Sequence, residues 1–117
     1  MFDLKDIQAA KKKLAEKRTD NSHDSYSDGL KILEEYKQSP DVATLEQAGK
    51  KFIEALEFNK DHIPSLIYLS YIFYTLSNDE IALKYLDMVF ALESNLPEEI
   101  IAYRNDIIRR LDENSNL

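Results

Sequence analysis

The chain has 117 residues, a length that fits a single domain with one hydrophobic core. Its formal net charge of -7 argues against nucleic acid and anionic membranes as partners, because phosphate binding depends on clustered Lys and Arg. Because it has only two Gly and three Pro, the chain is predicted to be all-α. The absence of Cys excludes disulfides and thiolate chemistry and suits the cytoplasm. Residues 1–10 mix acids with apolar side chains, so we expect neither a signal peptide nor a membrane span there.

The N-terminal segment, residues 1–20, is predicted to contain a basic amphipathic helix over residues 3–18. It carries six Lys or Arg against four Asp or Glu, whereas the rest of the chain is strongly acidic. We expect this segment to be a cap on the acidic body or a free arm, with the run Lys11–Lys13 on a solvated helix face. Residues 19–25 cluster Asn, Ser and Asp side chains that compete with helical hydrogen bonds, so they predict a linker.

The middle of the chain predicts three further helices. One is expected from near Ser25 to the break at Ser39-Pro40, and the next over residues 41–59 with apolar side chains on one side. The helix that follows, residues 64–77, contains no Asp, Glu, Lys or Arg. A helix of this composition must be covered nearly all round.

The last two helices show terminal signals. The fifth is predicted over residues 78–93, and Ser77 and Glu80 have the spacing of a capping box at its start. A sixth is expected over residues 97–112, with acids in its first turn and two arginines in its last, as the helix dipole favours. The two arginines are Arg109 and Arg110. Residues 113–117 are predicted to be a frayed tail.

An interval of 34 residues connects the predicted third helix with the fifth, and the fourth with the sixth. Large and small apolar side chains recur at this interval in the same order, which indicates two helix types that alternate along the chain. With a slightly longer connection near Pro40, the second helix falls into the same register. The paired positions are Ala48 with Ala82, Phe52 with Leu86, Ala55 with Val89, Leu56 with Phe90, Leu66 with Ile100, Leu69 with Tyr103 and Phe73 with Ile107.

Residues 63–96 show the pattern most clearly, with large residues around the small Ser70 in one helix and the small Ala82 in the next. This pattern resembles the tetratricopeptide repeat (TPR), a unit of two antiparallel helices. The resemblance implies antiparallel helical hairpins, with a repeat domain over residues 29–112 and with residues 21–28 as the linker and the start of the first hairpin. It also implies a protein-binding scaffold or adaptor without catalytic activity.

In TPR proteins the first helices of successive repeats line a groove that receives a peptide or a helix. Carried over to this chain, the resemblance implies a groove with an apolar centre bordered by Tyr hydroxyls. Such a groove suits an amphipathic helix or an extended apolar peptide. The implied partner-binding residues are Lys31, Glu35, Ile67, Tyr71, Tyr74, Ile101, Asn105 and Ile108.

Several interpretations remain open for the Tyr and Ile residues of this groove. They can be ordinary core covered by the chain's own first helix, the face on which two copies form a homodimer, a small ligand pocket, or the site of an external protein or peptide. The first helix would contribute Phe2, Leu4, Ile7 and Leu14. A dedicated chaperone for a secreted or assembling protein is an alternative function, which resembles the role of small acidic TPR proteins in bacterial export.

No arrangement of side chains predicts catalysis or metal binding. His23 lies in the predicted linker and His62 in a predicted turn between repeats, and neither has a second ligand or a nucleophile at a local spacing. Gly29 and Gly49 each stand alone within a helix, so they form no phosphate-binding loop. We therefore expect no enzyme, no cofactor and no metal.

Overall fold

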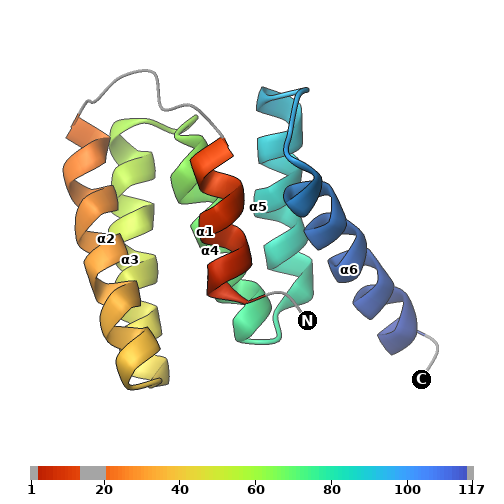
Figure 1. The fold of residues 1–117 in the computed structure, drawn as a ribbon, viewed down its shortest axis with the longest axis horizontal. Coiled ribbons are helices and arrows are strands. Elements are labelled where there is room, and N and C mark those ends of the chain that lie inside the picture. The colour runs from red at the N-terminus through yellow and green to blue at the C-terminus, as the bar shows by residue number, and fades with distance from the viewer. Residues whose placement is uncertain (1–2, 14–20, 116–117) are drawn as a thin grey trace.

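The computed structural model describes residues 3–13 and 21–115, which form six α-helices (Figure 1). This part of the chain contains no strand, and the all-α fold predicted from composition is confirmed. None of the described helices combines the length and the apolar character needed to span a lipid bilayer. The helices are α1 (Leu4–Lys13), α2 (Asn21–Gln38), α3 (Val42–Phe58), α4 (Ile63–Thr75), α5 (Asp79–Leu92) and α6 (Glu98–Ser115).

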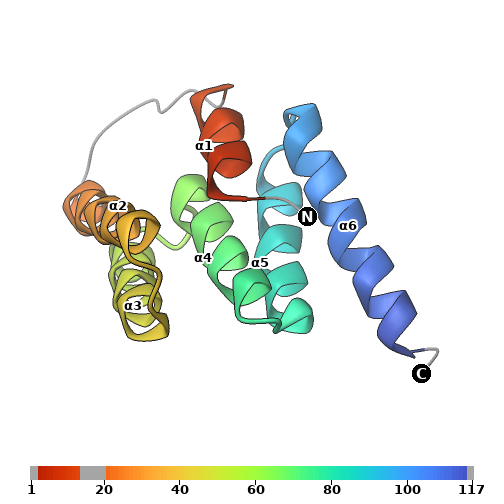
Figure 2. The same ribbon diagram turned by 60° about the horizontal axis from the view of Figure 1, so that its bottom comes forward.

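The helices from α2 to α6 pack as antiparallel neighbours in chain order (Figure 1). α2 and α3 form the first hairpin, α4 and α5 form the second, and these pairs have the most extensive contacts among the described helices. α3 packs on α4 and joins the hairpins, while α6 packs on α5 and closes the array. α1 departs from this order, because it lies against α4 and α6 (Figure 2). The fold is thus a short helical array with its first helix placed across later ones.

The 34-residue repeat of the sequence reappears in the burial of the side chains. Ala48 and its partner Ala82 are both fully buried, whereas Leu56 and its partner Phe90 are both half-buried. Ser70, a small residue of the repeat pattern, donates a hydrogen bond from its hydroxyl to the carbonyl oxygen of Ala82 at 2.7 Å. α4 and α5 therefore approach closely where two small residues meet.

α4 is the centre of the core, and ten of its 13 residues are buried. The rings of Phe52 on α3 and Tyr68 on α4 stack with their centroids 5.3 Å apart, and the ring of Tyr26 on α2 lies within 6.0 Å of both. The close approach of α2 and α3 at this cluster requires Gly29, since a Cβ there would lie 2.8 Å from the Phe52 ring. The helix without charged side chains is thus covered on nearly all sides, as its sequence predicts.

The turn between α4 and α5 differs from the predicted capping box that begins at Ser77. Ser77 has a left-handed φ of 63°, its N–H donates to the Tyr74 carbonyl at 3.1 Å, and the Asn78 N–H donates to the Phe73 carbonyl at 2.8 Å. These bonds form a Schellman ending of α4, with Ser at the position where Gly is usual. The N-cap of α5 is Asn78, whose side chain accepts a hydrogen bond from the Ile81 N–H. Ser77 ends one helix and does not start the next, so the predicted capping box is wrong.

The start of α2 also differs from the prediction. α2 begins at Asn21, so the linker predicted over residues 19–25 is wrong from residue 21 onward. Ser25 is buried in this added part of the helix, and its hydroxyl donates to Glu54 Oε1 on α3 at 3.4 Å. Packing on α3 therefore stabilises a segment whose own side chains compete with helix. The end of the first predicted helix falls within residues 14–20, which, like Phe2, lie outside the described residues.

α6 extends to Ser115, so part of the tail predicted to be frayed is helical. Arg109 and Arg110 consequently lie before the last turn, and their predicted position at the helix end is wrong. Arg109 instead donates to Asp106 Oδ1 at 2.6 Å on the same helix, and Arg110 pairs with Asp79 of α5. These arginines stabilise α6 through side-chain partners and not through the helix dipole.

Candidate functional site

The chain's own α1 lies on the first helices that were predicted to receive a partner. It packs against α4 and α6, between α2 and α6 (Figure 2). Among its described side chains, Leu4 and Ile7 are buried, with 5% and 1% of their surface exposed. Because these residues are three positions apart, they share one face of the helix. We term the part of α4 and α6 that α1 covers, which includes Tyr71, the docking surface.

The start of α1 is a reciprocal cap that was not predicted from the sequence. The Asp6 N–H donates to Asp3 Oδ1 at 3.1 Å, and the Asp3 N–H donates to Asp6 Oδ2 at 3.2 Å. Two aspartates thereby do what Ser and Glu do in a capping box. The signal that could have revealed it is a pair of acids three residues apart, directly before the apolar stripe.

Tyr71 connects α4 to the start of α1. Burial raises the pKa of the Tyr71 hydroxyl, and hydrogen bonds with the Thr75 side chain and with the Leu4 backbone oppose this rise only in part. Tyr71 therefore lies beside the first turn of α1, where Leu4 is.

The other two α4 residues of the predicted site belong to the core. Ile67 is 0% exposed and Tyr74 is 1% exposed. The Tyr74 hydroxyl donates to Asp106 Oδ2 on α6 at 2.7 Å, and the Arg110 guanidinium carbon lies 4.0 Å from the centroid of the Tyr74 ring. Tyr74 thus fastens α6 to α4 and offers almost no surface to a partner in this arrangement.

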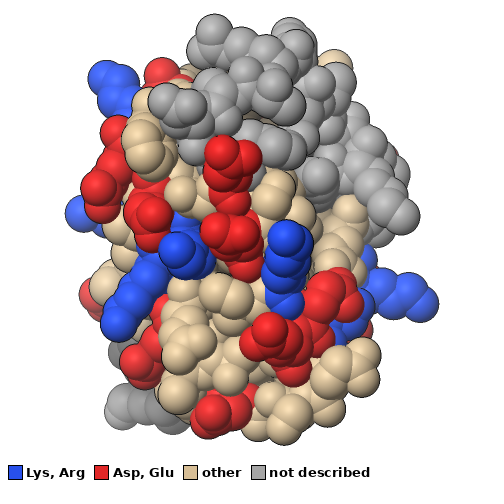
Figure 3. Space-filling view, turned by 90° about the vertical axis from the view of Figure 1, so that its left-hand side faces the viewer, with Lys and Arg blue, Asp and Glu red and all other residues tan. Residues whose placement is uncertain are grey.

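Lys31 and Glu35 on α2 are exposed, as a partner-binding role requires. On the same helix, Glu34 Oε1 accepts a hydrogen bond from the side-chain amide of Gln8 on α1 at 3.2 Å. α1 therefore reaches the side of α2 that carries the predicted residues. Over the α2–α3 hairpin, Lys side chains are interspersed with Asp and Glu (Figure 3). This mixed surface does not favour nucleic acid.

The three predicted residues on α6 lie apart from those on α4. Ile101 and Asn105 are exposed and Ile108 is half-buried. Asp106 bonds to Tyr74 and so marks the side of α6 that faces α4. At 3.6 residues per turn, Ile101 and Ile108 lie about 140° and about 160° around the helix axis from Asp106. The structure therefore splits the predicted site residues between two surfaces.

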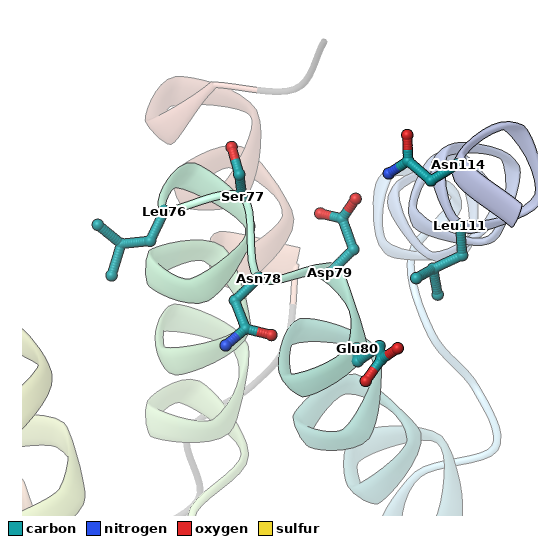
Figure 4. A pocket seen from close by; sticks show the side chains of 7 residues that line it. All are labelled: Leu76, Ser77, Asn78, Asp79, Glu80, Leu111 and Asn114. Carbon is teal, nitrogen blue, oxygen red and sulfur yellow. The ribbon is translucent and has the colours of Figure 1, made fainter. Parts of the chain in front are cut away.

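A hollow beside the α4–α5 turn faces the end of α6 (Figure 4). Its buried carboxylate, Asp79, is paired with Arg110, whose Nε donates to Oδ2 at 3.1 Å and whose Nη2 lies 2.9 Å from Oδ1. Asp79 therefore attaches α6 to α5, and its charge is already compensated. The hollow is lined by Leu76, Ser77, Asn78, Asp79, Glu80, Leu111 and Asn114.

The histidines take up structural positions. His62 is the N-cap residue of α4, its Nδ1 lies 2.8 Å from the Ser65 hydroxyl, and its ring contacts the Tyr26 ring with centroids 5.1 Å apart. His23 lies in α2 and not in a linker, and its side chain is outside the described set. Within the described residues, no three His, Asp or Glu side chains gather as a metal site would require.

The resemblance to TPR proteins rests on the 34-residue interval and on the antiparallel hairpins, and membership of that family stays a prediction. The chain thus presents a helical array with one of its own helices packed on α4 and α6. Comparison of the chain with protein-family models, with curated proteins and with solved structures finds no match.

Proposed function

We propose that the chain is a non-catalytic scaffold that binds another protein through the docking surface. The observation that carries this proposal is α1 itself, a ten-residue helix that rests on α4 and α6 with Leu4 and Ile7 buried. Recognition of a helix in a groove uses apolar anchors at this spacing. Tyr71 adds a hydroxyl at the border of an uncharged helix, which suits a ligand with one apolar and one polar face. The absence of Cys suits work in the cytoplasm.

The order of the helices also supports a binding role. In helical repeat arrays, corresponding helices of successive units form an extended binding surface, and here these are α2, α4 and α6. α1 contacts all three, since it packs on α4 and α6 and its Gln8 bonds to Glu34 of α2. A partner helix placed along the same path would have the same three helices within reach.

Partner capture with a matched pair of variants tests this function. Tyr71→Ala removes an aromatic side chain from the docking surface, whereas Phe58→Ala removes one that is 60% exposed at the end of α3. The tagged wild type and both variants are expressed in the native cell and cross-linked, and bound proteins are identified by mass spectrometry. We expect a partner that is recovered with the wild type and with Phe58→Ala, and whose recovery falls roughly ten-fold with Tyr71→Ala.

Circular dichroism first establishes that all three chains are folded. Equal recovery by all three would place partner binding elsewhere on the array. Recovery of no partner by any of them would contradict the scaffold function. If the recovered protein is insoluble when produced alone and soluble together with this chain, the scaffold acts as its dedicated chaperone.

A further inference from the structure

α1 depends on the docking surface for its helical structure. The ten described residues of α1 are too few to form a stable helix in water on their own. Its Gln8 side chain bonds to Glu34 of α2, and this bond is exposed to solvent. Its buried anchors among the described side chains are Leu4 and Ile7. A contact of this size is one that a competing helix can replace.

The charge of α1 complements that of the array. Residues 3–13 contain four Lys and two Asp, in a chain whose formal net charge is -7. A basic segment on an acidic body gains from electrostatic attraction, which salt screens. A competing helix gains from the same attraction only if it is also basic.

We propose that the partner of the docking surface is a basic amphipathic helix that resembles α1 and displaces it. Two aliphatic side chains of the partner, three residues apart behind an acidic N-cap, take the places of Leu4 and Ile7. Its first turn then lies beside Tyr71, as that of α1 does. This inference rests on the proposed function and adds to it the chemistry of the partner and a competitor built into the chain. Only molecules in which α1 is detached bind the partner, so the occupancy of α1 sets the apparent affinity.

Binding of the α1 sequence in trans tests the inference. The probe is a peptide of residues 3–13, acetylated so that Asp3 keeps its amide N–H and labelled with a fluorophore at its C-terminus. Its binding to the full-length chain is measured by fluorescence anisotropy. In the variant Leu4→Glu/Ile7→Glu, two charges at buried positions detach the chain's own α1. In the control Lys5→Glu, the net charge changes by the same amount at an exposed position.

We expect the peptide to bind the double variant roughly ten-fold or more tightly than the wild type or Lys5→Glu. In those two chains the docking surface is occupied in cis, at the high effective concentration of a tethered segment. Added salt should weaken the binding, because the peptide is basic and the array acidic. A peptide with Glu in place of Leu4 and Ile7 should not bind.

Equal binding to all three chains, or no binding to a folded double variant, would overturn the inference. If circular dichroism shows that the Glu variant is unfolded, Leu4→Ala/Ile7→Ala replaces it in the same comparison. A wild-type dimer with α1 exchanged between two copies, detected by sedimentation at increasing concentration, would overturn it too. The occupant would then be a second copy of the chain.

The inference and the proposed function can fail separately. If the peptide binds and no partner depends on Tyr71, the surface binds helices but the scaffold function fails. If a partner that depends on Tyr71 is recovered and the peptide does not bind, the scaffold function holds and the partner is not a helix of this kind.

Discussion

α4 and α1 are neighbouring helices with apolar faces, but the array holds them in different ways. Ten of the 13 residues of α4 are buried among the surrounding helices, whereas α1 buries Leu4 and Ile7 among its described side chains. α4 has no charged residue and would expose a wholly apolar surface if it left its place. α1 carries four Lys and an Asp, so it tolerates water on most of its surface. α4 is therefore an integral part of the core, whereas α1 makes a contact that can open.

This difference predicts how each helix responds to damage. A change in α4 acts on the whole fold, because α4 packs on both its neighbours in the array, α3 and α5. A change in α1 can be relieved by local opening, in which α1 detaches and the remaining helices stay folded. The loss of stability then cannot exceed the free energy with which α1 docks.

A matched pair of isoleucines should show the largest difference. Ile67 on α4 and Ile7 on α1 are both buried, with 0% and 1% of their surface exposed. Ile67→Ala leaves a cavity in the core, and we expect it to lower the free energy of unfolding by about 3 to 5 kcal/mol. Ile7→Ala should lower it by less than about 2 kcal/mol, because detachment of α1 limits the loss.

Chemical denaturation measures both free energies, and hydrogen exchange shows which backbone amides open. Ile7→Ala should speed exchange within α1, whereas Ile67→Ala should speed it throughout the array. Equal losses of stability in the two variants would mean that α1 unfolds only together with the rest, and the contrast between the helices would be wrong.

Gly29 and Gly49 test how tightly the helices of the core are packed. A Cβ added at Gly29 would lie 2.8 Å from the Phe52 ring, whereas one added at Gly49 would lie 3.8 Å from Ile72 Cδ1. We expect Gly29→Ala to lower the free energy of unfolding by about 1 to 3 kcal/mol through overpacking. Gly49→Ala should raise it by up to about 1 kcal/mol, because Ala favours helix. Thermal unfolding measures both, and a Gly29→Ala variant as stable as the wild type would show that the α2–α3 contact yields easily.

Asp106 should give the smallest effect and tests how α6, which carries part of the docking surface, is attached to α4. Burial raises the pKa of the Asp106 carboxyl, but hydrogen bonds from Arg109 and Tyr74 outweigh this, and the pKa lies below its usual value. The unfolded chain therefore binds this proton more readily than the folded chain. The resulting stability is present at neutral pH and is lost as the pH falls below about 4.

Asp106→Asn removes the titrating group while it keeps a side chain that can accept the Tyr74 hydrogen bond. We expect the free energy of unfolding of this variant to fall less steeply than that of the wild type between about pH 5 and about pH 3. Denaturant titrations at several pH values measure both slopes. Parallel slopes would show that Asp106 does not contribute to the acid sensitivity of the fold.

The helices of the array could be predicted because each depends on local pattern. α3, α4 and α5 lie close to their expected bounds, since apolar periodicity and Pro breaks define them. The start of α2 could not be predicted, because burial of Ser25 against α3 overrides the local preference of its polar residues. The role of Ser77 could not be predicted either. Its left-handed φ ends α4, and the next residue, Asn78, is the N-cap of α5.

The predicted site residues show the same limit of local sequence patterns. Periodicity places Ile67, Tyr71 and Tyr74 on one face of a helix, but it does not tell how deeply each is buried. Tyr71 lies at the contact with α1, whereas Tyr74 is held by Asp106 and Arg110 of α6. The far side of α6, where Ile101 lies, is turned away from α4 by these same contacts. The rotation of α6 about its own axis depends on the helices that it contacts, and no local sequence pattern specifies this rotation.

An array of amphipathic helices around one uncharged helix could be predicted from the amino-acid sequence alone, because propensity, periodicity and charge act locally along the chain. The sequence also shows an apolar stripe that includes Leu4 and Ile7, but it leaves open whether this segment is a cap or a free arm. The tertiary structure shows that Leu4 and Ile7 are buried and that α1 packs on α4 and α6 of the same chain. The reason is that the hydrophobic effect has no direction, so an apolar stripe encodes the need for a partner surface and not its identity.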